Sequence, residues 1–150
     1  MYIGHINLAK APNGAGDHFV HLIDALQSHG TRQHVLVRNV TLARRLDALD
    51  DVTVGPSVSS AVMACCLMPH VDIVHVHGAA DGQAGLLLTL TRSIPFVLTR
   101  RDELPGRNPV TQAIHRRASG IVYQGDNDAA KHLRIYRHAL AAWQARTASR

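Results

Sequence analysis

The feature that most constrains this chain is a regular alternation between short apolar runs and segments with helical periodicity. In the first helical segment, apolar residues fall three and four positions apart, which is typical of a helix with one packed face. The apolar runs lack polar alternation, so we expect strands covered on both faces. They predict an α/β fold, a Rossmann-like three-layer sandwich with a mostly parallel six-stranded sheet. The predicted strands are Tyr2–Asn7, Gln33–Arg38, Val52–Val54, Val71–His77, Pro95–Thr99 and Ile121–Gln124.

Capping and breaking residues locate the ends of the predicted helices. Gly30 follows the first helix in the position of a C-terminal glycine. Asn108 precedes Pro109 as an N-cap precedes a first-turn proline, and Asp126 is expected to cap the last helix. The loop 13–16 precedes the first helix. Other helices are predicted around 42–49, from about 57 to 68, and from about 81 to 91.

Length and composition indicate one self-sufficient domain. The chain has 150 residues, 46% of them hydrophobic, so it can bury a core without disulfides. We expect a domain over 1–144 and a polar C-terminal tail over 145–150. Adjacent Cys65 and Cys66 form no disulfide framework and suit a reducing compartment. No signal-peptide pattern or membrane-span run occurs, so we expect a cytoplasmic protein, with peripheral inner-membrane contact left open.

The net charge of +5 does not by itself indicate nucleic-acid binding. Arginines are scattered apart from three pairs, and aromatic residues make up only 4% of the chain. We therefore expect no nucleic-acid partner. Phosphorylated ligands and anionic headgroups remain compatible with the charge.

A glycine-containing stretch lies between the first strand and the first helix. Asn13, Gly14, Ala15 and Gly16 leave room for a ligand beside a helix N-terminus, where free N–H groups favour phosphate. The dinucleotide fingerprint fails because Phe19 stands where its third glycine belongs. A plain glycine turn and an NADP-linked reductase remain as alternatives; in the reductase, Arg38 at the end of the second strand would favour the 2′-phosphate.

His75 and His77 lie two residues apart on a strand and so share one face. A zinc site needs a third ligand, for which His5, His18 and His21 are candidates, but no carboxylate cluster accompanies them. We favour one core histidine and one histidine at the strand end, with no metal and no cofactor. His77 and Gly78 lie at the carboxyl end of the strand, where open α/β sheets bind ligands.

Arg100, Arg101 and Asp102 leave the carboxyl end of the fifth strand. The two guanidinium groups can clamp a phosphate or carboxylate, and the alternative is a surface pair bridged to Asp102 or Glu103. The sequence carries no nucleophile elbow, no Walker loop and no Asp-x-Asp pair.

Several of these segments together resemble the N-terminal, acceptor-side domain of family 4 glycosyltransferases of the GT-B fold. The similar segments are the glycine loop before the first helix, Leu-Gln-Ser-His-Gly at 26–30, Asp-Ile-Val-His-Val-His-Gly at 72–78, 94–99, 118–123 and 129–133. The resemblance covers about residues 1 to 138. It implies that the glycine stretch approaches a donor diphosphate and that His77 lines the cleft. It also implies a link to cell-envelope glycan assembly, such as lipopolysaccharide.

The chain departs from that family in two places. Arg101 stands near the position of a family histidine that approaches the reacting sugar. Glu103 is the sole glutamate, so the glutamate pair of the donor-binding C-terminal domain is absent. We therefore expect a half-protein that needs a separate donor-domain partner, or a degenerate homologue. Arg101 and His77 are the catalytic candidates. The substrate-binding candidates are Asn13, Gly14, Ala15, Gly16, Gly78, Arg100 and Asp102.

Two alternatives to a transferase stay open: a non-catalytic phosphosugar- or glycolipid-binding regulatory module, and the NADP reductase. Tyr136 and Trp143 on the last helix are expected to cover an apolar patch or form a homodimer contact.

Overall fold

The computed structural model describes residues 1–11, 14–78, 80–100, 108–125 and 128–149. Within these residues, six parallel strands alternate with six helices, and the sheet order is β3-β2-β1-β4-β5-β6. The α/β Rossmann-like architecture predicted from the sequence is confirmed. The strands are β1 (Tyr2–Asn7), β2 (Arg32–Val37), β3 (Val52–Val54), β4 (Ile73–Val76), β5 (Phe96–Arg100) and β6 (Gly120–Tyr123). The helices are α1 (Gly14–Gln27), α2 (Val40–Leu46), α3 (Ala61–Leu67), α4 (Gly82–Arg92), α5 (Pro109–Arg117) and α6 (Ala129–Ala148).

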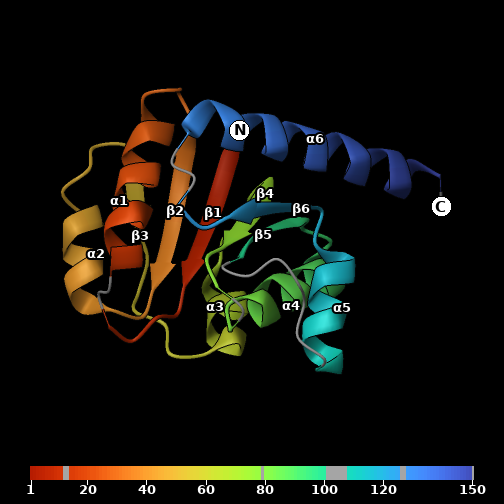
Figure 1. The fold of residues 1–150 in the computed structure, drawn as a ribbon, viewed down its shortest axis with the longest axis horizontal. Coiled ribbons are helices and arrows are strands. Elements are labelled where there is room, and N and C mark those ends of the chain that lie inside the picture. Colours follow the sequence, from red (N-terminus) through yellow and green to blue (C-terminus); the bar gives the residue numbers. More distant parts are fainter. Residues whose placement is uncertain (12–13, 79, 101–107, 126–127, 150) are drawn as a thin grey trace.

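The helices form two layers with the sheet between them (Figure 1). One face packs against α1, α2 and α6, and the other packs against α3, α4 and α5. Successive strand residues alternate between these layers: Val97 packs with α1 and α6, whereas Phe96 and Leu98 pack with α4. Helices cover both faces, which explains why the strands do not alternate between apolar and solvent-facing polar residues.

The sheet changes its direction of winding at β1. The chain moves from β1 outward to β2 and β3, then returns to β4 on the other side of β1 and continues to β6. The carboxyl ends of β1 and β4 therefore flank the topological switch point, the place where open α/β sheets bind ligands.

Capping side chains explain where several helices begin. Asn108 caps α5 ahead of a first-turn proline, as predicted, and its Oδ1 accepts the N–H of Val110 at 2.8 Å. Gly30 has φ +70°, the left-handed conformation that favours glycine after a helix. The α3 helix begins at Ala61, later than predicted, because Ser60 is its N-cap.

The boundaries of the first and last helices, α1 and α6, differ from the sequence prediction. The α1 helix begins at Gly14, so Gly14 to Gly16 form its first turn instead of a loop. Asp128, not Asp126, is the N-cap of α6, and its side chain accepts from Lys131 N–H; Asp126 lies outside the described residues. The α6 helix continues through Ala148, so 145–148 are helical where a tail was expected.

The last helix also corrects the prediction for Tyr136. This residue is fully buried in the core and does not cover a surface patch, whereas Trp143 is half-buried. Among the described helices, none combines the length and apolar character that crossing a bilayer requires.

Candidate functional site

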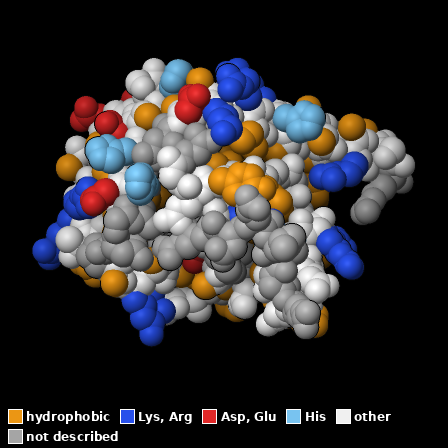
Figure 2. All heavy atoms as spheres, viewed as in Figure 1, with side chains coloured by type: hydrophobic (Ala, Val, Ile, Leu, Met, Phe, Trp, Pro, Cys, Tyr) orange, Lys and Arg blue, Asp and Glu red, His pale blue; other side chains and the backbone are white. Residues whose placement is uncertain are grey.

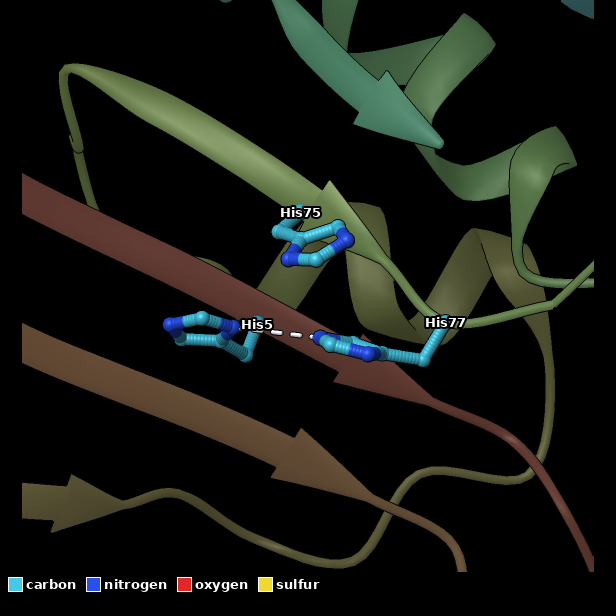
Figure 3. Close-up of side chains that lie close together, drawn as sticks. All are labelled: His5, His75 and His77. Atoms are coloured by element: carbon cyan, nitrogen blue, oxygen red, sulfur yellow. Dashed lines mark hydrogen bonds between the residues drawn. The ribbon is translucent and has the colours of Figure 1, made fainter. Parts of the chain in front are cut away.

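Three histidines meet on the α1/α6 face of the sheet. His5 of β1 lies in register with His75 of β4, and His77 follows two residues later on the same face. The side chains of His5 and His75 are fully buried, and His77 is half-buried at the end of the strand. Figure 3 shows the three rings converging between β1 and β4. The preferred interpretation of the sequence, a core histidine and a histidine at the strand end, agrees with this placement, but it did not include His5.

The hydrogen bonds of His75 fix its ring. One ring nitrogen, Nδ1, lies 2.7 Å from the hydroxyl of Tyr136 on α6, and Nε2 lies 2.7 Å from the hydroxyl of Thr99 on β5. Both hydroxyls can donate or accept, so they satisfy either tautomer of the neutral ring. The ring is therefore held between the sheet and α6.

His5 and His77 contact each other directly. His5 Nδ1 lies 3.2 Å from His77 Nε2, the dashed contact in Figure 3. The amide of Gln33 on β2 donates from Nε2 to the carbonyl of Ile23 at 2.9 Å. Its Oε1 is buried, as is His5 Nε2, and an interaction with Gln33 acts to raise the pKa of His5 against the larger lowering by burial.

Burial keeps these imidazoles neutral. The pKa of His5 is lowered to about 3, mainly by burial and also by the charge of His132. Burial is also the main reason why the pKa values of His75 and His77 lie well below the usual value, with smaller effects from neighbouring histidines. At neutral pH each ring therefore keeps one unprotonated nitrogen.

A small cavity opens above His77 at the carboxyl edge of the sheet. Its volume is about 40 Å³. The Phe19 ring meets His77 edge-on with ring centroids 4.4 Å apart, so α1 forms one wall. The remaining wall residues come from α1, from the ends of β1, β5 and β6, and from α6, and include Asn7, His18, Thr99, Gly125 and His132.

On the opposite side of the switch point, a buried carboxylate joins the two strand ends. Asp81 is 3% exposed, and its Oδ1 accepts the N–H of Leu8, just after β1, at 3.0 Å. Burial raises its pKa to about 7 despite backbone hydrogen bonds from Leu8 and His77. A Cβ at Gly78 would lie 3.4 Å from Asp81 Oδ2, so Gly78 sits beside this carboxylate. Sequence reasoning used Asp81 only as a helix start and missed this role.

The other predicted site residues are not all brought to His77. Strand alternation places Arg100 on the α4/α5 face, away from His77, and its charge contributes, after burial, to the lowered pKa of His115. Among the described residues, Arg100 Nη2 is buried without a partner. Arg101, Asp102 and Asn13 lie outside the described residues.

The glycine stretch and the remaining candidate zinc ligands also have defined positions. Gly16 is buried and lies in the first turn of α1, the helix that begins at Gly14. His18 lines the cavity and His21 is exposed, so His5 is the histidine that joins the pair on β4.

Comparisons with known proteins place the fold. No family model matches the chain, and no curated protein matches it. One similar structure is the N-terminal domain of a response regulator/sensory box/GGDEF three-domain protein from Carboxydothermus hydrogenoformans, with TM-score 0.63, 13% identity and coverage of 98% of this chain and 99% of that one. Another is Anabaena Alr3699/HepE in complex with UDP, with TM-score 0.59, 15% identity and coverage of 93% of this chain. The match spans 41% of the HepE chain. These likenesses show the Rossmann-like fold.

Proposed function

We propose that this chain is the acceptor-side domain of a family 4-like GT-B glycosyltransferase and binds a phosphorylated sugar or glycolipid at its carboxyl edge. The observation that carries the proposal is the position of His77. Its half-buried imidazole lines a cavity at the switch point, beside the carboxyl ends of β1 and β4. A separate donor-domain protein completes the enzyme, and the reaction belongs to cell-envelope glycan assembly on the inner membrane.

The chemistry of this edge suits an anionic sugar ligand. His77 is neutral, so it can accept or donate one hydrogen bond to a sugar hydroxyl without carrying a charge. The α1 helix begins at this edge with two glycines in its first turn, and helix N-termini favour phosphate. Stabilisation of a leaving phosphate by backbone N–H groups and by Arg101 needs no divalent ion.

The similarity to HepE supports the nucleotide-sugar context. That protein was solved with UDP, and UDP is the product that a UDP-sugar leaves after transfer. Because the match spans 41% of the HepE chain, we assign binding of the sugar donor to another domain.

Calorimetric titration with monosaccharide phosphates and with a short-chain lipid-linked sugar phosphate tests the proposal. The buffer contains a chelator, so that bound metal plays no part. We expect saturable binding that His77→Ala weakens by at least about tenfold, the effect of losing one good hydrogen bond. His138→Ala, at an exposed position on α6, is the matched control and should bind as the native chain does. Absence of binding by every ligand, or equal binding by both variants, would reject the site.

A second candidate function is a non-catalytic regulatory module. The near-complete mutual coverage with the response-regulator N-terminal domain, 98% and 99%, favours it. A sugar-transfer assay with the chain, a UDP-sugar and a separate donor-domain protein distinguishes the two. Turnover that depends on His77 supports the transferase, and binding without turnover in any mixture supports the module.

A further inference from the structure

The strongest unassigned feature is the nitrogen-only character of the cluster at the switch point. One ring nitrogen from each of His5, His75 and His77 lies within 4.8 Å of the other two. We propose that these three imidazoles bind one divalent transition-metal ion of the Zn²⁺ type, an inference that goes beyond the sugar-binding function.

The spacing of two of the ligands already fits a metal. His5 Nδ1 and His77 Nε2 are 3.2 Å apart. Two nitrogens on one tetrahedral zinc, each at about 2.0–2.1 Å, are separated by roughly 3.3 Å. An ion placed between them therefore needs little movement of either ring, and it replaces a hydrogen bond between two acceptor-capable nitrogens.

The third ligand comes with outer partners in place. His75 contacts Tyr136 through Nδ1 and Thr99 through Nε2. Coordination through either nitrogen gives up one hydroxyl and keeps the other, and a hydrogen bond of that kind orients metal-bound histidines.

The first ligand has a candidate outer partner as well. His5 Nε2 and Gln33 Oε1 are both buried, and neither has a hydrogen-bond partner among the described residues. An imidazole N–H pointing to a carbonyl oxygen is the usual outer contact of a metal-bound histidine, and a small rotation completes it here. Metal binding thus offers a use for two polar atoms that the apo arrangement leaves unsatisfied.

The donor set selects the class of ion. Among the described residues, the cluster contains neither a carboxylate nor a thiolate. Imidazole donors suit Zn²⁺, Co²⁺, Ni²⁺ and Cu²⁺, whereas Mg²⁺ and Ca²⁺ prefer oxygen. Burial disfavours the charged imidazolium form, so an unprotonated nitrogen is available on each ring.

His77 connects the cluster to the outside. It lines the cavity together with Asn7 and Thr99, whereas His5 and His75 are fully buried beneath His77. Three protein ligands with one position directed to such a cavity leave room for an exchangeable fourth ligand, as in open zinc sites.

Titration of metal-free protein with Co²⁺ and Zn²⁺ tests the proposal without any enzyme assay. We expect one Co²⁺ per chain, with the strong visible absorption of a four-coordinate site, and displacement of Co²⁺ by one equivalent of Zn²⁺. Saturating Zn²⁺ should raise the melting temperature, because the ion binds the folded state. His77→Ala should weaken binding by at least about a hundredfold, since it removes one of three ligands.

Exposed histidines supply the controls, because the chain has 11 histidines and some will bind metal weakly. His21→Ala and His138→Ala should leave the one-to-one Co²⁺ spectrum unchanged, as both side chains are exposed. Should His77→Ala retain the native affinity, or should the surface variants abolish binding, the ion is held by surface histidines and the proposal is wrong. Lack of any one-to-one binding would mean that the cluster is a hydrogen-bonded core element only. To cover misfolding, Gln33→Leu gives a second test: it keeps all three ligands and should weaken Co²⁺ binding about tenfold.

Discussion

At the scale of single residues, the molecule brings three imidazoles together on two neighbouring strands, two of them fully buried and one half-buried. A buried polar group without a partner costs about 1–3 kcal/mol, and hydrogen bonds remove that cost. His75 has a hydroxyl on each side, and His5 and His77 share a contact, so most of their nitrogens are satisfied. These contacts would not stabilise a protonated, positively charged imidazole, because among the described residues no carboxylate belongs to the cluster.

The stability of metal-free protein should therefore fall in acid. The pKa of His5 is lowered from 6.5 to about 3 in the folded chain, and those of His75 and His77 are lowered too. The unfolded chain binds more protons below 6.5, so stability is present above that pH and is lost as pH falls. Each such histidine contributes a slope of up to about 1.4 kcal/mol per pH unit. Urea denaturation with chelator, between about pH 7 and about pH 5, measures it.

A histidine substitution isolates this slope from other titrating groups. Asp81 acts in the opposite direction, because its pKa is raised to about 7 and charging it costs stability as pH rises. Its contribution cancels between the native chain and His5→Gln, whose slope should be smaller by up to about 1.4 kcal/mol per pH unit. His138→Gln should keep the native slope, because this side chain is exposed. Identical slopes in the native chain and His5→Gln would contradict the account.

At the scale of helices and strands, glycines set how closely α4 approaches its neighbours. A Cβ on Gly85 would lie 2.6 Å from Phe96 Cδ2, and one on Gly82 would lie 2.7 Å from Ile114 Cγ2. These positions bring the α4 backbone against β5 and α5. By contrast, a Cβ on Gly16 of α1 would meet only Leu42 Cδ1, at 4.0 Å.

Two glycine-to-alanine substitutions should therefore have opposite effects on the free energy of unfolding. Gly85→Ala should destabilise by about 1–3 kcal/mol, because Phe96 is fully buried and cannot move away freely. Gly16→Ala should stabilise by up to about 1 kcal/mol through the higher helix propensity of alanine. Urea denaturation of the two variants at neutral pH compares them directly. Equal effects would show that α4 does not need its close approach.

The sequence predicted the positions of the helices and strands better than it predicted which residues contact each other between them. Strand positions held to within about two residues, since the apolar runs on both faces are a local signal. The pairing of His5 with His75 was not accessible, because it depends on the register between strands about seventy residues apart. For the same reason His5, His18 and His21 could not be ranked as partners. The burial of Tyr136 likewise depends on how α6 packs, which one helical stripe does not specify.

At the scale of the whole molecule, the two edges of the sheet differ. The carboxyl edge carries the small cavity above His77, and the amino edge carries a groove of about 650 Å³ beneath α6. Trp143, Arg137 and Asp72 line that groove. On the face seen in Figure 2, the described Lys and Arg side chains are spread around the outline and do not form one patch. A homodimer contact at Trp143 stays a prediction that gel filtration tests.

The C-terminal part of α6 extends past the body of the domain (Figure 1), so we expect the last residues to contribute little to the stability of the fold. Residues 144–149 are exposed, whereas Tyr136, nearer the start of α6, is fully buried against His75. Removing residues 145–150 should reduce the helical circular-dichroism signal but change the free energy of unfolding by less than about 0.5 kcal/mol.

Tyr136→Phe provides the comparison on the same helix. It keeps the ring and removes the hydroxyl that reaches His75 Nδ1, so a buried nitrogen loses its partner and about 1–3 kcal/mol should be lost. Urea denaturation of the shortened chain and of Tyr136→Phe measures both changes. A shortened chain less stable than Tyr136→Phe would contradict this account. It would show that the last turns of α6 make stabilising contacts, and the groove at the amino edge is the nearest surface for them.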